Sequence, residues 1–535
     1  MNRVLIYAAL CGAWCWCATP VAAERVVYAV AIGNNAPPAS EPSLAALRYA
    51  DDDAVRYYEL FKRAGKHVAL LTVLDDSTQR RHPAFRSVAT APTLAMLQRT
   101  LASFRAAMAG DRKRGDEPVI FLTFSGHGAV DEHGSYFLSL LDGGLTRQRL
   151  YDEILTPLSD TETHLIIDAC NAEGVVGIRG PFDHEADGEV ITLDEAETRG
   201  VVQLQSLARF PLAGAIVASS AGQETHEWSR IEAGVFTHEL ISALLGAADI
   251  NGDLRIEYSE VHAFIAAANQ QVADPRAVPD VLTHAPTGNP RAVLLDLAKL
   301  DDTVFLIGPA KELGRFSAVL PDGRRLVDVH VSGTGRVVVA LPRRTGMYVQ
   351  RGDQEAEIPY GSSQVSFAAL HFQPMEASAR GRLDRTLRDA LFALAYSADY
   401  YRGFIDSHGT ASVDFSVGPR ALPTDPHVAS SSTAAKPTDD ASKGGLALPV
   451  SLLVISGVAL VASATTLVMA LDAKSEVEDT SLQRRARELN DRYRTLATIS
   501  VAAAAVSATT GLCAFVAWPK DDAGVSAGAT VFGRF

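Results

Sequence analysis

Short apolar runs alternate with helical stretches through the first half of the chain, and this alternation limits the possible folds more than any other feature. Runs with the length of buried strands occur at Val26–Ile32, Val68–Leu74, Val119–Phe124, Leu165–Asp168 and Ala215–Ser219. Between them, helical spacing of apolar residues occurs at Leu44–Ala64, Thr93–Ala109 and Leu150–Leu158. Strands and helices in this order predict an α/β fold, in which helices sandwich a mostly parallel sheet.

Two of these strands end in segments that carry reactive side chains. Ser125-Gly126-His127-Gly128 follows one strand, and Asp168-Ala169-Cys170-Asn171 follows the next. Sites in parallel sheets form beyond the carboxyl ends of the strands, so we expect His127 and Cys170 to lie close together. A thiol beside an imidazole is a nucleophile beside its base, and the amides of Gly128 and Cys170 could hold a developing oxyanion. The alternative is a structural turn histidine and a small cysteine that fills the core.

The N-terminus predicts a signal peptide over residues 1–23. Arg3 precedes an apolar run that extends to about Ala18, and Val21-Ala22-Ala23 supplies the small residues of a cleavage site. The alternative is an uncleaved membrane anchor. Five cysteines among 535 residues exclude a small disulfide-stapled scaffold. Cleavage would leave Cys170 and Cys513. Because Cys513 lies in an apolar stretch near the C-terminus that is predicted to span the membrane, Cys170 would be the one thiol of the exported body, which suggests that it has a function.

The C-terminal part predicts a membrane hairpin on a flexible stalk. Residues 446–471 and 496–518 are uncharged and long enough to cross a bilayer as helices, and a buried soluble hairpin is the alternative. The loop 472–495 between them carries six lysine and arginine side chains and is therefore expected in the cytoplasm, and the second span is followed by a tail over 519–535. Residues 417–445 are small and polar, as in a linker. Together with the signal peptide, this predicts a membrane-anchored protein whose catalytic body lies in the periplasm of a Gram-negative bacterium.

Several motifs of the exported body resemble those of a known family. The matching segments are Val30–Asn34, Leu47–Ala54, Ser125–Gly128, Asp168–Asn171 and Gly234–Thr237. Over about residues 25 to 270 the chain resembles caspase-like cysteine peptidases, the clan that also includes metacaspases. The resemblance implies a caspase-like peptidase domain over residues 24–297. In it, His127 would act as general base and then acid, and Cys170 would attack the scissile carbonyl.

The resemblance also implies a specificity. In metacaspase-like members, the positions of Asp53, Ser125 and Asp168 line the pocket for the residue before the cleaved bond. Two carboxylates favour a cationic side chain, so cleavage after Arg or Lys is expected. The alternative for Asp53 is an exposed helix charge beside Asp51 and Asp52.

The chain departs from the metacaspase pattern directly after the nucleophile. Metacaspases usually have His-Ser-Gly there, whereas Asn171-Ala172-Glu173-Gly174 follows Cys170 in this chain. A polar segment at residues 180–200 resembles a self-cleavage loop, with Arg179 and Arg199 as candidate cleavage positions. An uncut surface loop is the alternative.

Residues 249–260 resemble the calcium loop of an EF-hand, which makes calcium a candidate cofactor. The flanking segments, Phe236–Ala248 and Val261–Ala273, have helical patterns. Leu254 stands where the sharp turn usually needs glycine, and a left-handed leucine is unfavourable. The alternative is a polar helix–helix turn that has lost the ion. The candidate ligands are Asp249, Asn251, Asp253, the carbonyl of Arg255, Glu257 and Glu260.

Residues 298–416 predict a β-rich accessory domain, because their apolar residues alternate with a period of two. An antiparallel sandwich is the natural class, and residues 381–404 predict a terminal helical segment. We find no nucleophile set in this region, so a binding or spacer module is expected.

The combined prediction is a membrane-tethered, exported cysteine endopeptidase that acts on protein or peptide substrates. An inactive caspase-like scaffold at the membrane is the main alternative, although scaffolds tend to lose one member of the catalytic pair. A third reading is a hydrolase or transferase that uses the same pair on a non-peptide acyl group. The net charge of −14 argues against a nucleic acid partner.

Overall fold

The structure of the chain is a computed structural model. It describes residues 23–131, 133–177, 207–219, 227–228, 231–272, 278–321, 323–375 and 390–423. Apart from Ala23, the predicted signal peptide lies outside these residues, as do both predicted membrane spans. Within the described ranges, no helix combines the length and the apolar character needed to cross a bilayer.

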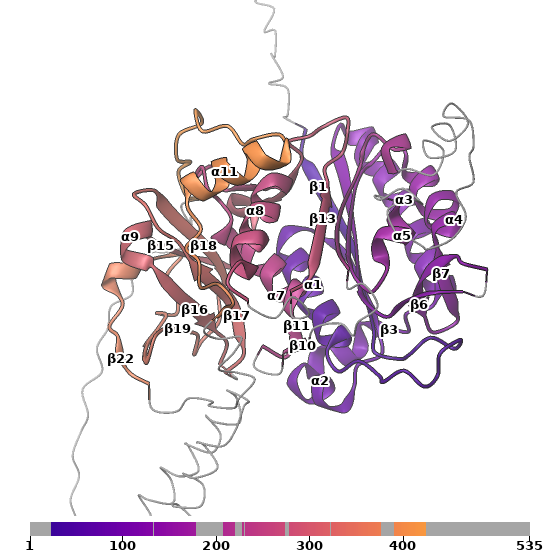
Figure 1. Cartoon of the computed structure of the whole chain (residues 1–535), viewed down its shortest axis with the longest axis horizontal. Coiled ribbons are helices and arrows are strands. Elements are labelled where there is room, and N and C mark those ends of the chain that lie inside the picture. Colours follow the sequence, from indigo (N-terminus) through magenta and orange to yellow (C-terminus); the bar gives the residue numbers. More distant parts are fainter. Residues whose placement is uncertain are drawn as a thin grey trace, which may run out of the picture.

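A seven-stranded sheet forms the centre of the N-terminal half (Figure 1), in the order β13-β9-β8-β4-β1-β2-β3. Its strands are β1 (Arg25–Asn34), β2 (His67–Thr72), β3 (Ala89–Thr90), β4 (Glu117–Gly126), β8 (Glu162–Asp168), β9 (Ala213–Ser219) and β13 (Asp280–His284). Neighbouring strands run parallel except β13, which is antiparallel to β9. The predicted mostly parallel sheet is therefore confirmed.

Helices bury both faces of this sheet, which explains why its strands are apolar throughout. In β1, Val27, Ala29 and Ala31 face one core, whereas Tyr28 and Ile32 face the other. The first core is covered by α1 (Ala50–Ala64), α7 (Val235–Ser242) and α8 (Tyr258–Asn269). The second is covered by α3 (Leu94–Arg114) and α5 (Ala172–Val176).

The apolar spacing predicted that this helix begins at Leu44, but α1 begins at Ala50. The first amides of a helix lack partners inside it. Here the side chain of Asn35 accepts hydrogen bonds from the amide of Ala50 at 2.9 Å and from the next amide at 3.3 Å. Glu227 accepts from the amides of Arg48 and Tyr49, both at 2.8 Å. Residues distant in sequence therefore set the start of this helix.

Short elements complete the N-terminal half. A small antiparallel sheet consists of β5 (Gly128–Val130), β6 (Tyr136–Leu140) and β7 (Gly143–Thr146). Two further strand pairs are β10 (Glu227–Trp228) with β11 (Ala233–Gly234), and β12 (Arg255–Glu257) with β14 (Val293–Asp296). The short helices are α2 (Asp76–Arg81), η1 (Pro83–Ser87), α4 (Arg147–Arg149), η2 (Leu150–Leu155), η3 (Thr156–Leu158), η4 (Leu207–Arg209), η5 (Ala243–Ala247) and η7 (Leu297–Lys299).

The C-terminal half is β-rich, as predicted, with one departure. One sheet has the order β18-β15-β21 and the other β17-β16-β19-β20-β22. The pair β15 and β21 is parallel, so the region is not the purely antiparallel sandwich that was expected. The strands are β15 (Thr303–Pro309), β16 (Arg315–Val319), β17 (Arg325–His330), β18 (Arg336–Pro342), β19 (Tyr348–Arg351), β20 (Gln354–Glu357), β21 (Gln364–Ser366) and β22 (Gln373–Pro374).

Its helices are α9 (Ala310–Leu313), η8 (Phe367–Ala369) and α11 (Ala398–His408). Helix α11 therefore covers the last part of the predicted segment 381–404 and extends four residues beyond it, whereas residues 381–389 lie outside the described part. The side chain of Ser397 caps this helix by accepting from the amide of Tyr400 at 3.2 Å.

The two halves share one continuous core. Side chains of α1, α7, α8 and the β-rich strands belong to the same buried cluster, and α7 lies against β17. Asp328 on β17 is buried at this junction, where its carboxylate accepts from His238 at 2.8 Å, from Ser317 at 2.8 Å and from Arg325 at 2.9 Å. Because buried charges need such partners, this network holds the β-rich half in a defined orientation.

Candidate active site

The reactive segments meet at the carboxyl ends of two neighbouring parallel strands. In the register of β4 and β8, Ser125 lies opposite Asp168, and two residues further along the chain in each case are His127 and Cys170, just beyond the strand ends. The backbone of Gly128 packs against Cys170, because a Cβ built on Gly128 would lie 1.9 Å from the Cys170 carbonyl oxygen. The amide of Ser139 on β6 donates to the His127 carbonyl at 2.9 Å and anchors this turn. The predicted pair therefore lies at one sheet edge.

Replacing Gly128 by alanine is expected to destabilise the protein by about 2–4 kcal/mol, because the new methyl group overlaps a backbone carbonyl that cannot rotate away. Urea unfolding would measure the effect. Gly335→Ala is the matched control, since no atom lies within 4 Å of a Cβ at that position. Equal stability of the two variants would contradict the close packing of Gly128 against Cys170.

The three residues predicted to line the specificity pocket are also brought together. The hydroxyl of Ser125 donates to the Asp53 carboxylate at 2.8 Å, and the amide of Gly234 donates to it at 3.1 Å. Thr237 donates to Asp168 at 3.4 Å. A Cβ on Gly234 would lie 2.8 Å from an Asp168 oxygen and 3.0 Å from an Asp53 oxygen, so both carboxylates flank this glycine.

The alternative of an exposed helix charge is wrong for Asp53, which is only 1% exposed. Its neighbours Asp51 and Asp52 are buried as well, and each has a partner. Asn35 donates to Asp51 at 2.8 Å, and the guanidinium of Arg81 donates to both oxygens of Asp52. The three carboxyls occupy the first turn of α1, where the helix dipole favours negative charge.

Burial and mutual repulsion raise the pKa values of the pocket carboxyls. The pKa of Asp168 is raised to about 7, first by burial and then by the charge of Glu227. Burial, followed by the charge of Asp168, raises the pKa of Asp53 well above its usual value. The pKa of the Cys170 thiol is raised to about 11 by burial, Asp168 and Glu173. The thiol is therefore protonated at neutral pH, and its reaction requires a base.

Asp168 gives a testable pH dependence of stability. Because its folded pKa of about 7 lies above the unfolded value of 3.8, its contribution is fully present below pH 3.8 and is lost as the pH rises through 7. Asp168→Asn removes this titration. The free energy of unfolding of the variant, relative to the unmodified protein, is expected to rise by roughly 3 kcal/mol between pH 5 and pH 8. Urea unfolding at both pH values measures this difference.

The control for this experiment is Asp399→Asn, at a side chain that is 96% exposed. This side chain contacts solvent in the folded as well as the unfolded state, so its variant should track the unmodified protein at both pH values. A pH-independent difference for Asp168→Asn would mean that this carboxyl is not held in its neutral form.

The segment after the nucleophile has its own geometry. Asn171 adopts a left-handed conformation with φ of 56°, which asparagine tolerates better than most residues, and α5 starts immediately after it. The carboxyl of Glu173 is buried near the thiol, whose pKa its charge raises. The sequence pattern assigned no role to Glu173. The proposed self-cleavage segment, with Arg179 and Arg199, lies outside the described residues.

The sequence pattern also assigned no role to Gly234 or Thr237, although their motif was one of the segments that match the family. Their contacts to Asp53 and Asp168 depend on β11 and α7 packing next to α1, about 180 positions away from Asp53 in the chain. The position of this glycine in a family motif was the one signal in the sequence.

The loop at residues 249–260 has the expected backbone shape, but its carboxylates are engaged by amides. Leu254 adopts the left-handed conformation, with φ of 63°. Asp249 accepts from the amides of Gly252 and Leu254. Glu260 accepts from the amides of Ile250 and Glu257 at 3.0 and 2.9 Å. Burial and repulsion from Asp253 raise the pKa of Asp249 to about 7.

The other candidate side-chain ligands of this loop also form hydrogen bonds. Asn251 and Asp253 accept from backbone amides two residues further on, at 3.1 and 2.9 Å, and Glu257 pairs with Arg291 at 3.0 Å. Among the residues that the structure describes, no group of three or more His, Cys, Asp or Glu is placed to hold a metal ion. Calcium binding by this loop therefore stays a prediction.

No curated protein matches the chain. Among solved structures, protein GSU0716 from Geobacter sulfurreducens is similar at 17% identity, covering 49% of this chain and 94% of that chain with a TM-score of 0.28. Caspase-1 from Spodoptera frugiperda is similar at 11% identity, with coverages of 49% and 87% and a TM-score of 0.29.

The family assignment rests on a match of a different kind. Residues 26–287 match the model of the caspase domain, peptidase family C14, whose members are cysteine peptidases. This range includes the whole central sheet except Arg25, and every residue of the candidate active site. Residues 26–287 are therefore a caspase domain.

Proposed function

We propose that the caspase domain is an active cysteine endopeptidase with His127 and Cys170 as its catalytic pair. The observation that carries this proposal is the register of β4 and β8, which pairs Ser125 with Asp168 and leaves His127 and Cys170 at equivalent positions just beyond. The packing of Gly128 against the Cys170 carbonyl supports it further. A nucleophile and its base that directly follow adjacent strands of one sheet are suitably placed for covalent catalysis, which supports the proposal.

The proposed reaction follows from the protonated state of the thiol. The imidazole of His127 removes the thiol proton as the Cys170 sulfur attacks the substrate carbonyl carbon. The carbonyl oxygen becomes an oxyanion, for which the amides of Gly128 and Cys170 are the proposed donors. When the carbon–nitrogen bond breaks, the imidazolium returns the proton to the leaving amine and a thioester remains. Water, deprotonated by the same imidazole, then hydrolyses the thioester and restores the thiol.

We further propose that cleavage occurs after Arg or Lys. Asp53 and Asp168 flank Gly234 with both carboxyls buried, so an unpaired negative charge there is costly. A cationic substrate side chain would stabilise the charged carboxylates and release protons to solvent. Binding of Arg or Lys is therefore favoured over binding of a neutral or acidic side chain.

Fluorogenic peptides that end in Arg, Lys or Asp test this function on the full-length chain. Cleavage after Arg or Lys is the expected result. Cleavage only after Asp would keep the catalytic pair but contradict the pocket assignment, and no cleavage by folded protein would favour the inactive scaffold. Parallel reactions with calcium and with a chelator test whether the 249–260 loop has its predicted role.

Export and membrane tethering belong to the same proposal. Their support is the signal-peptide pattern at residues 1–23 and the two apolar stretches near the C-terminus. A tethered peptidase in the periplasm would act on substrates at the membrane surface.

A further inference from the structure

One buried glutamate joins the β-rich half to the wall of the specificity pocket. Glu232 lies between β10 and β11, two residues before Gly234, whose amide donates to Asp53 at 3.1 Å. One oxygen of the Glu232 carboxylate lies 3.4 Å from Nε of Arg81 on α2. The same oxygen lies 3.8 Å from Nε of Arg324, in the turn that connects β16 to β17. The caspase domain and the β-rich half therefore meet on this side chain.

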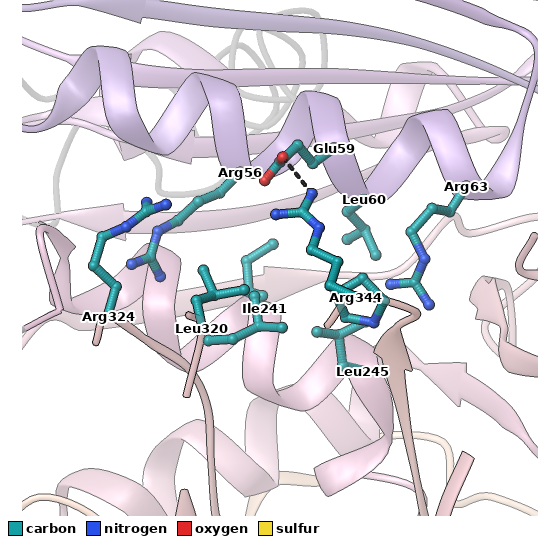
Figure 2. Close-up of a pocket in the computed structure, with 11 residues that line it drawn as sticks. Arg56, Glu59, Leu60, Arg63, Ile241, Leu245, Leu320, Arg324 and Arg344 are labelled. Atoms are coloured by element: carbon teal, nitrogen blue, oxygen red, sulfur yellow. Dashed lines mark hydrogen bonds and ion pairs between the residues drawn. The ribbon is translucent and has the colours of Figure 1, made fainter. Parts of the chain in front are cut away.

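The ion pairs of Glu232 are shielded from solvent. The side chains of Glu232 and Arg81 are each 4% exposed, and that of Arg324 is 5% exposed. Figure 2 shows Arg324 pointing from the β-rich half toward α1, where it lies beside Arg56. The turn that carries Arg324 is closed by a backbone hydrogen bond, from the amide of Leu320 to the Arg324 carbonyl at 2.8 Å. Because buried charges need charged partners, the position of this turn is coupled to that of Glu232.

The backbone of Glu232 adopts a conformation that is unfavourable for its residue type. Its φ is 48°, in the left-handed region that residues other than glycine rarely adopt. Such a conformation persists where the surrounding contacts determine it, and these positions cluster at functional sites. The amide of Glu232 donates to the Trp228 carbonyl at 3.0 Å, and Arg56 donates to the carbonyl of the preceding residue, Ile231. A turn alone would favour glycine here, so the ion pairs account for the glutamate.

The same network reaches the specificity pocket from α1. Arg81 donates to both oxygens of Asp52, one of them at 2.6 Å, and Asp52 directly precedes Asp53. Burial raises the pKa of Asp52 to about 6, and the charge of Arg81 opposes this increase. Gly234 and Asp53 are therefore connected in two ways. One is their direct hydrogen bond, and the other runs through Glu232, Arg81 and Asp52.

We propose that Glu232 is a positioning residue through which the β-rich half holds Gly234 in the specificity pocket. A Cβ on Gly234 would lie 2.8 Å from Asp168 and 3.0 Å from Asp53, so a shift of this backbone changes the space beside both carboxylates. The effect on substrate rests on the proposed function, in which these carboxylates bind the Arg or Lys side chain. The β-rich half is then a part of the substrate site and not only a spacer.

Removing the carboxylate is expected to weaken substrate binding without slowing the chemical step. In Glu232→Gln, KM for Arg peptides should rise about tenfold and kcat should change less than about threefold, because His127 and Cys170 follow strands with their own register. Glu232→Gly should give the same result. Glycine adopts the left-handed conformation readily, so this variant keeps the turn and loses the ion pairs. Partial unfolding would instead lower kcat and leave KM unchanged.

Arg324→Gln tests the contribution of the β-rich half. It should raise KM as Glu232→Gln does, and the double variant should raise it little further, because the two side chains act as a pair. Arg324 takes part in other interactions as well, and the double variant separates their effect from that of the pair. The matched control is Glu59→Gln, which breaks another ion pair between α1 and the β-rich half, with Arg344 at 2.6 Å. It should leave KM unchanged.

Amide hydrogen exchange of the full-length chain provides a readout that needs no activity. Exchange in residues 231–237 is expected to become about tenfold faster in Glu232→Gly and in Arg324→Gln, whereas residues 119–125 of β4 should be unaffected. If the Glu232 variants do not fold, Arg324→Gln carries both readouts.

The proposal is overturned if exchange in residues 231–237 or KM is the same in these variants as in the unmodified protein. It is also overturned if Glu59→Gln changes them equally. If exchange responds as expected but none of the proteins cleaves any peptide, only the proposed function is rejected.

Discussion

Replacing Cys170 by alanine is expected to lower kcat/KM for peptide cleavage by about 10⁴-fold or more, while the free energy of unfolding changes by less than about 1 kcal/mol. The variant removes the sulfur that forms the thioester, so the two-step route is lost. The site is otherwise held by backbone register and by Gly128, neither of which depends on the thiol. Peptide hydrolysis and urea unfolding on the same preparation separate the two effects.

Three further variants make this result specific. His127→Ala should cost nearly as much as Cys170→Ala, and the double variant should cost little more than either, because the pair acts as a unit. Cys513→Ala is the control for thiol loss, since it removes the other cysteine that would remain after the predicted signal cleavage. Activity in Cys170→Ala equal to that of the unmodified protein would show that another group is the nucleophile.

Asp168→Asn is expected to lower kcat/KM for Arg and Lys peptides by about 10²–10³-fold, the cost of removing one partner of a buried charge pair. The amide keeps the size of the side chain and can still meet Thr237, so the backbone should remain in place. Because the pKa of Asp168 is about 7, the loss is expected to be larger at pH 8 than at pH 6, where the unmodified carboxyl is mostly protonated.

A peptide that ends in a neutral residue provides the control for this experiment. Its cleavage, however slow, should be unaffected by Asp168→Asn, because no cation enters the pocket. Asp53→Asn should show the same selectivity, since its carboxyl flanks the same glycine. An equal loss for cationic and neutral peptides would mean that these carboxyls support the fold of the site and do not select the substrate.

The outline of the fold follows from local pattern. Apolar runs with the length of strands alternate with segments of helical spacing, and this was sufficient to predict a mostly parallel sheet. Such runs are apolar almost throughout because helices bury both faces of the sheet. The carboxyl ends of β4 and β8 could be located in the same way. Their adjacency was an inference, and the register of Ser125 with Asp168 confirms it.

Boundaries that depend on distant partners were not predictable. The start of α1 is set by Asn35 and Glu227, which satisfy amides that no local residue reaches. A period-two pattern cannot reveal that β21 pairs in parallel with β15, because alternation reports which face is buried and not which strand is the neighbour.

The proposed site residues and the residues that surround them were therefore predictable to different degrees. His127 and Cys170 could be named from the sequence because they follow strand ends in short motifs, and Asp53 and Asp168 were implied by the family resemblance of their motifs. The burial of Asp53, the contacts of Gly234 and the ion pair between Glu232 and Arg324 required the tertiary structure. Burial and electrostatic fields are sums over atoms that are near in space, and most of those atoms come from parts of the chain that are remote in sequence.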